Sequence, residues 1–311
     1  MNKTVCGLLI FSLAWGPWAC APHESIKEKQ ALTVKETERV KSKYTGPKRR
    51  IGVVDFENKA PYGQGRLGNV ATDILITELT KTGKFIVIER DKLNSLMAEQ
   101  KFGQSGAVDP NTAAKVGRVL GLNAIVTGAV TGFGVKTTGD EALLYQSKSQ
   151  VAQATVDLRV VDVETGQILL ADSGEGVATS TKRGILGLGG RGGYDETLEG
   201  DALRAALVKF VDNIVNQVNS RPWSCRVAAV EGNQVYLDAG QASGLQIGQE
   251  LTAYHTGKDI VSPTTGLVIG QTEDEIGSLE VVRFFGDDGA ISKVTKGVLP
   301  SPKDICRFGG Q

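Results

Sequence analysis

The sequence predicts an α+β fold: a mixed body in which strands alternate with helices and two β-hairpins extend outward, followed by a small all-β domain. Three observations support this fold class. Apolar runs of strand composition alternate with segments of helical period between residues 50 and 221. Beyond that point, short alternating runs are separated by turn glycines. The chain has 39 glycines, which suits many turns and strands better than a helical bundle.

The elements of the body, residues 50–221, follow from hydrophobic periodicity. Strands are expected at Ile51–Phe56, Lys84–Glu89, Asn123–Thr131, Val151–Val163 and Gln167–Asp172. Helices are expected from an Asn69 cap to Gly83, from Asp91, from Pro110 to Leu120, and over Leu198–Val218. Residues 133–155 and 172–197 remain. Each segment is long enough for two spanning strands of about 9 to 11 residues and a turn, so these are the expected hairpins.

The C-terminal segment, residues 222–311, predicts a separate small β-domain, either a barrel or a sandwich. Its expected strands include Val235–Asp238, Leu251–Tyr254 and Val281–Phe285. Acidic residues lie among glycines in its expected loops, at Glu273, Asp274, Glu275, Asp287 and Asp288. Solvated turns account for these carboxylates, and a calcium site is the alternative.

The N-terminus predicts export. A positive start precedes the apolar run Val5–Trp15, which is too short to span a bilayer, so residues 1–20 are interpreted as a signal peptide. Cys20 directly follows a small residue and is the candidate lipidation site; ordinary cleavage after Ala21 is the alternative. Several acyl chains on one cysteine would hold it firmly at a membrane. Residues 21–49 are rich in Lys and Glu without a clear period, which predicts a flexible tether.

Composition argues against several classes of protein. Formal net charge is zero, with 35 Lys and Arg against 35 Asp and Glu, so nothing favours nucleic acid as a partner. No later apolar run approaches the ~20 residues of a spanning helix. The two histidines, His23 and His255, have no ligand residue at metal-binding spacing, and no serine lies in a nucleophile elbow. We therefore expect no metal, no cofactor and no catalytic residue, and hence no enzyme.

A glycine-rich stretch, GILGLGGRGG, satisfies the pattern G-x-G-x-x-G at Gly187, Gly189 and Gly192. A nucleotide site would need a strand before this motif and a helix opening at its end. The sequence on either side supplies neither. The stretch is therefore interpreted as the tip of the second hairpin.

Two cysteines, Cys225 and Cys306, remain once the signal peptide and Cys20 are set aside. In an oxidising periplasm two leftover thiols usually pair. Such a disulfide would join the first and last strands of the C-terminal domain. Two separate buried thiols are the alternative.

Several stretches resemble known families. Thr72–Phe102 (TDILITELTKTGKFIVIERDKLNSLMAEQKF), Gly121–Gly132 (GLNAIVTGAVTG) and Val156–Leu169 (VDLRVVDVETGQIL) are similar to the curli secretion channel (CsgG) family of outer-membrane lipoproteins. This resemblance covers roughly residues 50–219. A shorter resemblance, to the C-terminal domain of flagellar assembly protein T, lies in Val235–Gly248 and Pro263–Gly270.

The first resemblance implies a ring of identical subunits, each contributing two hairpins to a shared outer-membrane barrel. In that family a loop carrying Tyr, Asn and Phe narrows the lumen. Here Tyr62 stands in the matching loop, with Arg66 and Leu67 where Asn and Phe are expected. These three are the candidate constriction residues, and a ring of Arg66 would give the pore a different filter. An ordinary surface loop is the alternative.

Alternation along the expected hairpins assigns their faces. One weakly apolar face would hold Phe133, Val135, Thr137, Tyr145, Ser147, Ser149 and Val151, and the opposite face Lys136, Asp140, Lys148 and Gln150. In the second hairpin, Glu175, Thr179, Thr181 and Arg183 would lie opposite Ser180 and Lys182. A charge at mid-bilayer can cost about 2 to 4 kcal/mol, so charged positions would have to face the lumen or the interfaces.

We therefore expect a lipid-anchored protein on the periplasmic face of the outer membrane. It would be a subunit of a ring-forming secretion channel of the curli production assembly/transport type. Its partners would be further copies of itself, outer-membrane lipid, and secreted fibre subunits or envelope assembly proteins. The alternative is a non-pore, lipid-tethered periplasmic scaffold for assembling envelope or surface structures.

Overall fold

The computed structural model describes most of the chain beyond Pro47. The described residues are 44, 46–63, 65–88, 91, 93, 95, 116, 117, 120–142, 145–185, 197–264 and 268–308. The expected signal peptide, the candidate lipidation site Cys20, most of the expected tether and the G-x-G-x-x-G glycines lie outside them. Only isolated positions of the helices expected from Asp91 and Pro110 are included.

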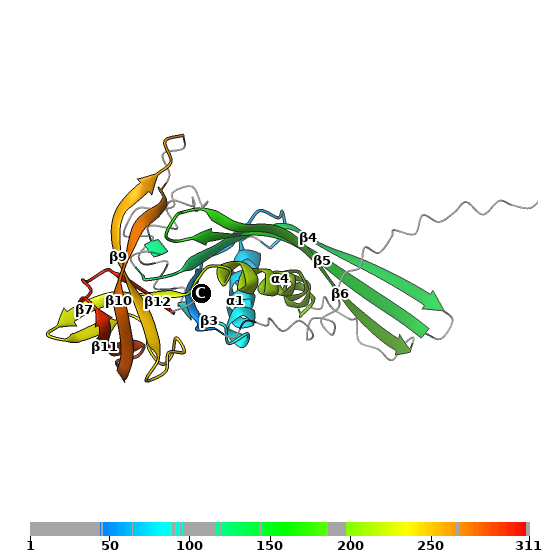
Figure 1. Ribbon diagram of the computed structural model, residues 1–311. Coiled ribbons are helices and arrows are strands. Elements are labelled where there is room, and N and C mark those ends of the chain that lie inside the picture. Colours follow the sequence, from blue (N-terminus) through cyan, green and yellow to red (C-terminus); the bar gives the residue numbers. More distant parts are fainter. Residues whose placement is uncertain are drawn as a thin grey trace, which may run out of the picture. The chain divides into compact units, whose positions relative to one another are not determined.

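One sheet forms the body, in the order β3-β1-β4-β5-β6. Strand β1 (Arg49–Val53) pairs in parallel with β3 (Phe85–Ile88) on one side and with β4 (Ala124–Ala142) on the other. Strands β4, β5 (Tyr145–Asp162) and β6 (Ile168–Ile185) are antiparallel and lie side by side (Figure 1). The short strand β2 (Glu57–Asn58) adds two parallel pairs beside β4. The mixed sheet confirms the expected α+β body.

Helices α1 (Arg66–Lys81) and α4 (Thr197–Val218) pack against each other, and α4 covers one face of β5 and β6. The core between them is apolar and closed to water: Leu75, Leu158, Leu203 and Leu207 are at most 1% exposed. Burial on this scale is the main source of the body's stability. No helix in the described part of the chain is long and apolar enough to cross a bilayer.

Helix α1 begins three residues before the expected Asn69 cap, which was therefore wrong. Its N-cap is Gly65, whose φ of 90° is a backbone conformation that suits glycine. Asn69 is exposed within the first turn, while Leu67 and Gly68 are buried. A side chain at position 68 would collide with the carbonyl oxygen of Phe56. Close packing of the first turn against the chain after β1, and not a capping side chain, sets the start of the helix.

The C-terminal segment forms a closed six-stranded barrel in the order β10-β11-β8-β7-β12-β9, which confirms an all-β fold. Its strands are β7 (Ser224–Glu231), β8 (Gln234–Leu237), β9 (Glu250–Val261), β10 (Val268–Phe285), β11 (Gly289–Gly297) and β12 (Ile305–Phe308). Alternate residues fill its interior, among them Val235, Leu237, Leu251 and Val281.

Two expectations for the acidic residues of this barrel need correction. Glu273, Asp274 and Glu275 lie in strand β10 and not in a loop. Glu273 is held by Arg307 through two hydrogen bonds of 2.5 and 2.7 Å. Asp288 lies in a turn, but its side chain is only 11% exposed and is bonded to Arg50. Protein partners therefore hold both of these carboxylates.

Candidate functional site

The candidate site is the outer half of strands β4, β5 and β6, called here the strand extension (residues 132–142, 145–155 and 175–185). All three strands continue far beyond the parallel part of the sheet, and pairing persists to Ala142 opposite Tyr145. Tyr145 in turn lies opposite Ile185. The segment expected as the first hairpin is therefore a long paired hairpin. Of the second, residues 172–185 form the outer part of β6, and residues 186–196 lie outside the described part of the chain.

The register divides the described side chains of the strand extension between two faces, because directly opposite residues share a face. The helix-side face holds Phe133, Val135, Thr137, Gln150, Ala152, Ala154, Gly176, Ala178 and Ser180. The open face holds Gly132, Gly134, Lys136, Thr138, Ser149, Val151, Gln153, Thr155, Glu175, Val177, Thr179 and Thr181. The only charges among these residues, Lys136 and Glu175, are on the open face.

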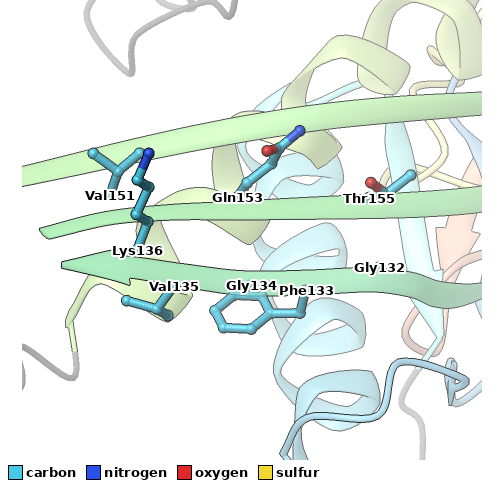
Figure 2. Close-up of a pocket in the computed structure, with 8 residues that line it drawn as sticks. All are labelled: Gly132, Phe133, Gly134, Val135, Lys136, Val151, Gln153 and Thr155. Atoms are coloured by element: carbon cyan, nitrogen blue, oxygen red, sulfur yellow. The ribbon is translucent and has the colours of Figure 1, made fainter.

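This register corrects the expected face assignment. Val151 lies opposite Lys136, not on the face of Val135, and Gln150 lies opposite Thr137. Figure 2 shows the same division, with Lys136 and Val151 on one side of the strands and Phe133 and Val135 on the other. Ala142 lies opposite Tyr145, so within the strand extension odd-numbered residues of β4 pair with even-numbered residues of β5.

An open groove of about 330 Å³ runs along the open face (Figure 2). It exists because Gly132 and Gly134 lack side chains between Lys136, Gln153 and Thr155. A methyl group at position 134 would meet nothing within 4 Å. The strand extension thus has a hollowed outer surface at its base.

The two edges of the strand extension are open within the described residues. Strand β4 pairs with β2 only at Ala129 and Val130, and beyond Val130 it pairs with β5 alone. Strand β6 likewise pairs only with β5. An unpaired strand edge presents a row of N–H and C=O groups that can pair with another strand. The extension can therefore be continued at either edge.

The loop at the base of the strand extension, residues 58–66, is tied down by hydrogen bonds. The amides of Lys59 and Ala60 donate to the carbonyl of Val130 at 2.9 and 3.1 Å. The Asn58 side chain donates to the carbonyl of Tyr62 at 2.7 Å and accepts from the amide of Ala60 at 3.1 Å. The loop is therefore folded onto β4.

Glu199, in the first turn of α4, anchors the far end of this loop. The Tyr62 hydroxyl donates to one of its carboxylate oxygens at 3.0 Å, and the Arg66 guanidinium donates to the other at 2.5 Å. Glu199 is only 5% exposed. The Tyr62 ring also packs on Phe133, with centroids 4.9 Å apart. One buried carboxylate thus joins helix α4 to the loop and, through Tyr62, to the helix-side face.

The three candidate constriction residues have different surroundings. Leu67 is fully buried in the core between α1 and the sheet. Tyr62 is 38% exposed, and the Arg66 side chain is 59% exposed. Because Glu199 pairs with Arg66, the two side chains together carry no net charge. Tyr62 and Arg66 are therefore the two candidates whose side chains reach solvent in a single chain.

Replacing Glu199 by alanine is expected to lower the free energy of unfolding by about 2 kcal/mol, because two hydrogen-bond donors lose a buried carboxylate. Amide hydrogen exchange over residues 57–66 should accelerate. Replacing Arg66 by alanine should cost less than Glu199→Ala, since the Tyr62 hydroxyl still donates to the buried carboxylate and Arg66 itself is largely solvent-exposed. Urea unfolding and hydrogen exchange measure the two effects. Unchanged exchange of the loop in Glu199→Ala would contradict the anchoring role.

The remaining candidate residues lie in the barrel. Cys225 and Cys306 are buried free thiols, directly opposite each other on β7 and β12. His255 lies with its Nδ1 2.9 Å from a carboxylate oxygen of the buried Asp304. Within the residues that the structure describes, no three His, Cys, Asp or Glu side chains gather as a metal site would require.

Sequence reasoning did not single out Glu199, although a signal was present. Ala202, Leu203, Ala206 and Leu207 follow it at the three-, four-, seven- and eight-residue intervals of one helix face. An acid on the apolar face of a helix is rarely buried without a partner. The partners, Tyr62 and Arg66, lie more than 130 positions away in the chain, and nothing local identifies them.

Comparison with known proteins gives relatives of two kinds. A lipoprotein of Neisseria meningitidis serogroup B is 35% identical over 233 residues, covering 72% of this chain and 98% of its own. The curli production assembly/transport component CsgG of Escherichia coli K12 is 30% identical over 177 residues. That match covers 54% of this chain and 59% of the E. coli protein.

Solved structures give weaker matches. Lipoprotein GNA1162 from Neisseria meningitidis is 19% identical, covering 56% of this chain and 99% of its own, with a TM-score of 0.31. The PelC dodecamer from Paraburkholderia phytofirmans is 16% identical, covering 54% of this chain and 93% of its own, with a TM-score of 0.27. Such scores say nothing about function.

The model of one protein family matches residues 31–247, which is more than half of the chain. The matched range includes the loop at residues 58–66, Glu199 and all three strands of the extension. The chain therefore belongs to the family of the curli production assembly/transport component CsgG.

Proposed function

We propose that this protein is a non-catalytic, outer-membrane-associated lipoprotein that forms rings and serves as a subunit of a protein secretion channel of the curli production assembly/transport type. Acylation of Cys20 would anchor it on the periplasmic face. Secreted fibre subunits or envelope assembly proteins would be its partners. The observation that carries the proposal is the three-stranded extension, which pairs continuously to Tyr145 and Ile185 and has two open edges.

Strand direction supports the expected second hairpin. Strands β4 and β6 run the same way, each antiparallel to β5. Direct pairing of β6 with β4 of a neighbouring copy would be parallel, whereas strands of bacterial outer-membrane pores alternate in direction. A return strand within residues 186–196, which lie outside the described residues, would restore the alternation. Each copy would then contribute four strands to a common pore wall.

The position of the loop supports one face of the extension as the lining of the lumen. Tyr62 packs on Phe133, so the loop lies on the helix-side face. If Tyr62 and Arg66 line a constriction, that face must point into the pore. Lys136 would then point outward, but it lies opposite Val151, next to the buried Ala152, in the inner half of the extension. A charged side chain near the membrane interface costs only about 0 to 1 kcal/mol, so a lipid-facing Lys136 at that depth would destabilise the pore little.

A pair of adjacent cysteine substitutions tests the channel and its lumen together. Ser180 and Thr179 are neighbours in β6 on opposite faces of the extension. In planar bilayers, uniform conductance steps are expected from wild-type protein. A charged methanethiosulfonate reagent should reduce these steps in Ser180→Cys and leave Thr179→Cys unchanged. Wild type serves as the reagent control, because Cys225 and Cys306 are at most 5% exposed.

A second candidate function, a lipid-tethered scaffold without a pore, is favoured by one observation. The helix-side face is covered as far as Gln150, which is 5% exposed. Beyond the level of its partner Thr137, only the five residues Thr138–Ala142 of β4 remain. They span roughly 17 Å, less than the ~25 Å apolar band of a spanning barrel. Absence of conductance steps from acylated, folded protein would establish this reading against the channel.

In the scaffold reading, the C-terminal barrel would carry the partner-binding surface. Its Val235–Gly248 stretch, for which we expect a likeness to the C-terminal domain of flagellar assembly protein T, includes Val235–Leu237 of strand β8 and the turn region that follows. Ile247 in that turn is 64% exposed. A tethered body with an attached recognition domain would assemble other envelope components without transporting them.

A further inference from the structure

We infer that Cys225 and Cys306 are oxidised to a disulfide in the exported protein and that this bond locks the C-terminal barrel shut. The two residues lie directly opposite each other across the antiparallel pair β7 and β12. Opposite residues of antiparallel strands have Cα atoms about 4.5 to 5.5 Å apart. That separation falls within the range that a disulfide bridges, about 4.4 to 6.8 Å.

The side chains also face one another. Cys225 is 5% exposed and Cys306 0%, and both belong to the same core cluster. A hydrogen bond with the Cys306 thiol, together with burial, raises the pKa of Cys225 well above its ordinary value. Both sulfurs therefore lie within reach of each other inside the barrel, and no backbone rearrangement is needed to bring them together.

The bond would close the barrel at one of its two shortest strands. Strand β12 has four residues, and it joins β7 to β9 through three pairs on one side and four on the other. Cys306 follows Cys225 by 81 positions, so the cross-link closes a long loop of the unfolded chain. Long loops give the larger stabilisations, because more conformational freedom is removed from the unfolded state.

The redox step balances by thiol–disulfide exchange. The two thiols lose their hydrogens and form one sulfur–sulfur bond, and the two electrons reduce a disulfide of the oxidant to two thiols. The oxidant is a small-molecule or protein disulfide, such as oxidised glutathione. Because the thiolate is the attacking species, the two buried thiols of the folded barrel would react slowly, and the raised pKa of Cys225 slows its own reaction further. Oxidation should therefore precede closure of the barrel.

Trp223 supplies an optical reporter of the bond. It is 4% exposed, packs on Phe308 with ring centroids 5.0 Å apart, and shares a core cluster with both cysteines. The other two tryptophans, Trp15 and Trp18, lie in the predicted signal peptide. Mature protein would thus have a single tryptophan beside the two sulfurs. Reducing the bond should increase its fluorescence, since a neighbouring disulfide quenches indole emission.

The test compares full-length protein exported with its own leader against protein lacking residues 1–20, refolded with oxidised glutathione. Peptide mapping without reductant should join the peptides of Cys225 and Cys306 in both preparations. Reduction should lower the thermal midpoint of the barrel by about 10 °C. The matched control, Cys225→Ala with Cys306→Ala, should show neither a reductant-dependent midpoint nor a fluorescence change.

The two preparations separate this inference from the proposed function. Free thiols at both positions in exported, folded protein would overturn the inference. If the leader is not cleaved and the protein stays in a reducing compartment, export is refuted and the refolded preparation decides about the bond. A cross-linked peptide in the refolded preparation supports the inference, and separate alkylated peptides in that preparation overturn it.

Discussion

Replacing Gly176 by alanine is expected to lower the free energy of unfolding by about 3 kcal/mol, the upper part of the range for overpacking a core. Gly176 lies in β6 where α4 crosses the sheet. A methyl group there would fall on the carbonyl oxygen of Ala202 and the amide nitrogen of Ala206. Both are helix backbone atoms, so no side-chain rotation relieves the collision. Helix α4 would have to move away from β6, which opens the core around Phe210.

The matched control is Gly134→Ala in the neighbouring strand β4. A methyl group at that position has open space around it, and alanine in a strand interior is favoured over glycine by about 0.5 to 1 kcal/mol. This variant should be as stable as wild type or slightly more stable in urea or thermal unfolding. Similar losses in both variants would mean that strand flexibility, and not the helix contact, explains the effect. A loss confined to Gly176→Ala places α4 against β6 as described.

The long strands show which structural features can be predicted from a sequence and which cannot. The length and position of residues 133–155 and 172–197 predict extensions, and the structure has paired strands over residues 133–142, 145–155 and 172–185 of these segments. Which side chains share a face was harder to predict, because the pairing register depends on the number of residues that join β4 to β5. A tip with one residue more or fewer would have placed Val151 beside Val135 instead of Lys136. Local composition does not fix that number.

Contacts between distant segments could not be predicted from the sequence either. The sequence offers Arg66 as a candidate constriction residue, but it gives no sign of the partner Glu199, which lies 133 positions away. Asp288 was treated as a solvated turn residue, because Arg50 lies 238 positions away. Periodicity identifies which residues are buried, whereas charge pairing depends on how elements meet. The elements were therefore predicted better than the electrostatics of the site.

The carboxylate of Asp288 in the barrel accepts four hydrogen bonds. Its oxygens accept hydrogen bonds from the amides of Gly240 and Ser243 at 2.9 and 2.8 Å and from the Ser243 hydroxyl at 2.5 Å. Arg50 of strand β1 donates a fourth bond at 2.8 Å. Burial alone would raise the pKa of Asp288, but the bonds from Ser243, Arg50 and Gly240 outweigh it and hold the pKa below its ordinary value.

Asp288→Asn is therefore expected to lower the free energy of unfolding by about 3 kcal/mol at neutral pH, because an amide offers a donor where Ser243 and Arg50 also donate. The lowered pKa also sets the pH dependence. The unfolded carboxyl titrates near 3.9, so the stabilisation is complete above roughly pH 5 and is lost as the pH falls through the folded pKa. The difference between wild type and variant should therefore shrink below about pH 4.

Asp238 provides a control, because its pKa is shifted in the opposite direction to that of Asp288. Burial raises the pKa of this carboxyl despite the hydrogen bond it accepts from the amide of Arg226. Its charged form costs stability above the folded pKa, and that cost disappears as the pH falls below the unfolded pKa. Asp238→Asn keeps the acceptor and removes the charge. Relative to this variant, wild type should gain stability on acidification, whereas relative to Asp288→Asn it should lose it. Urea unfolding at pH 7, 5 and about 3 measures both slopes, and parallel slopes would mean that the turn holding Asp288 is solvated after all.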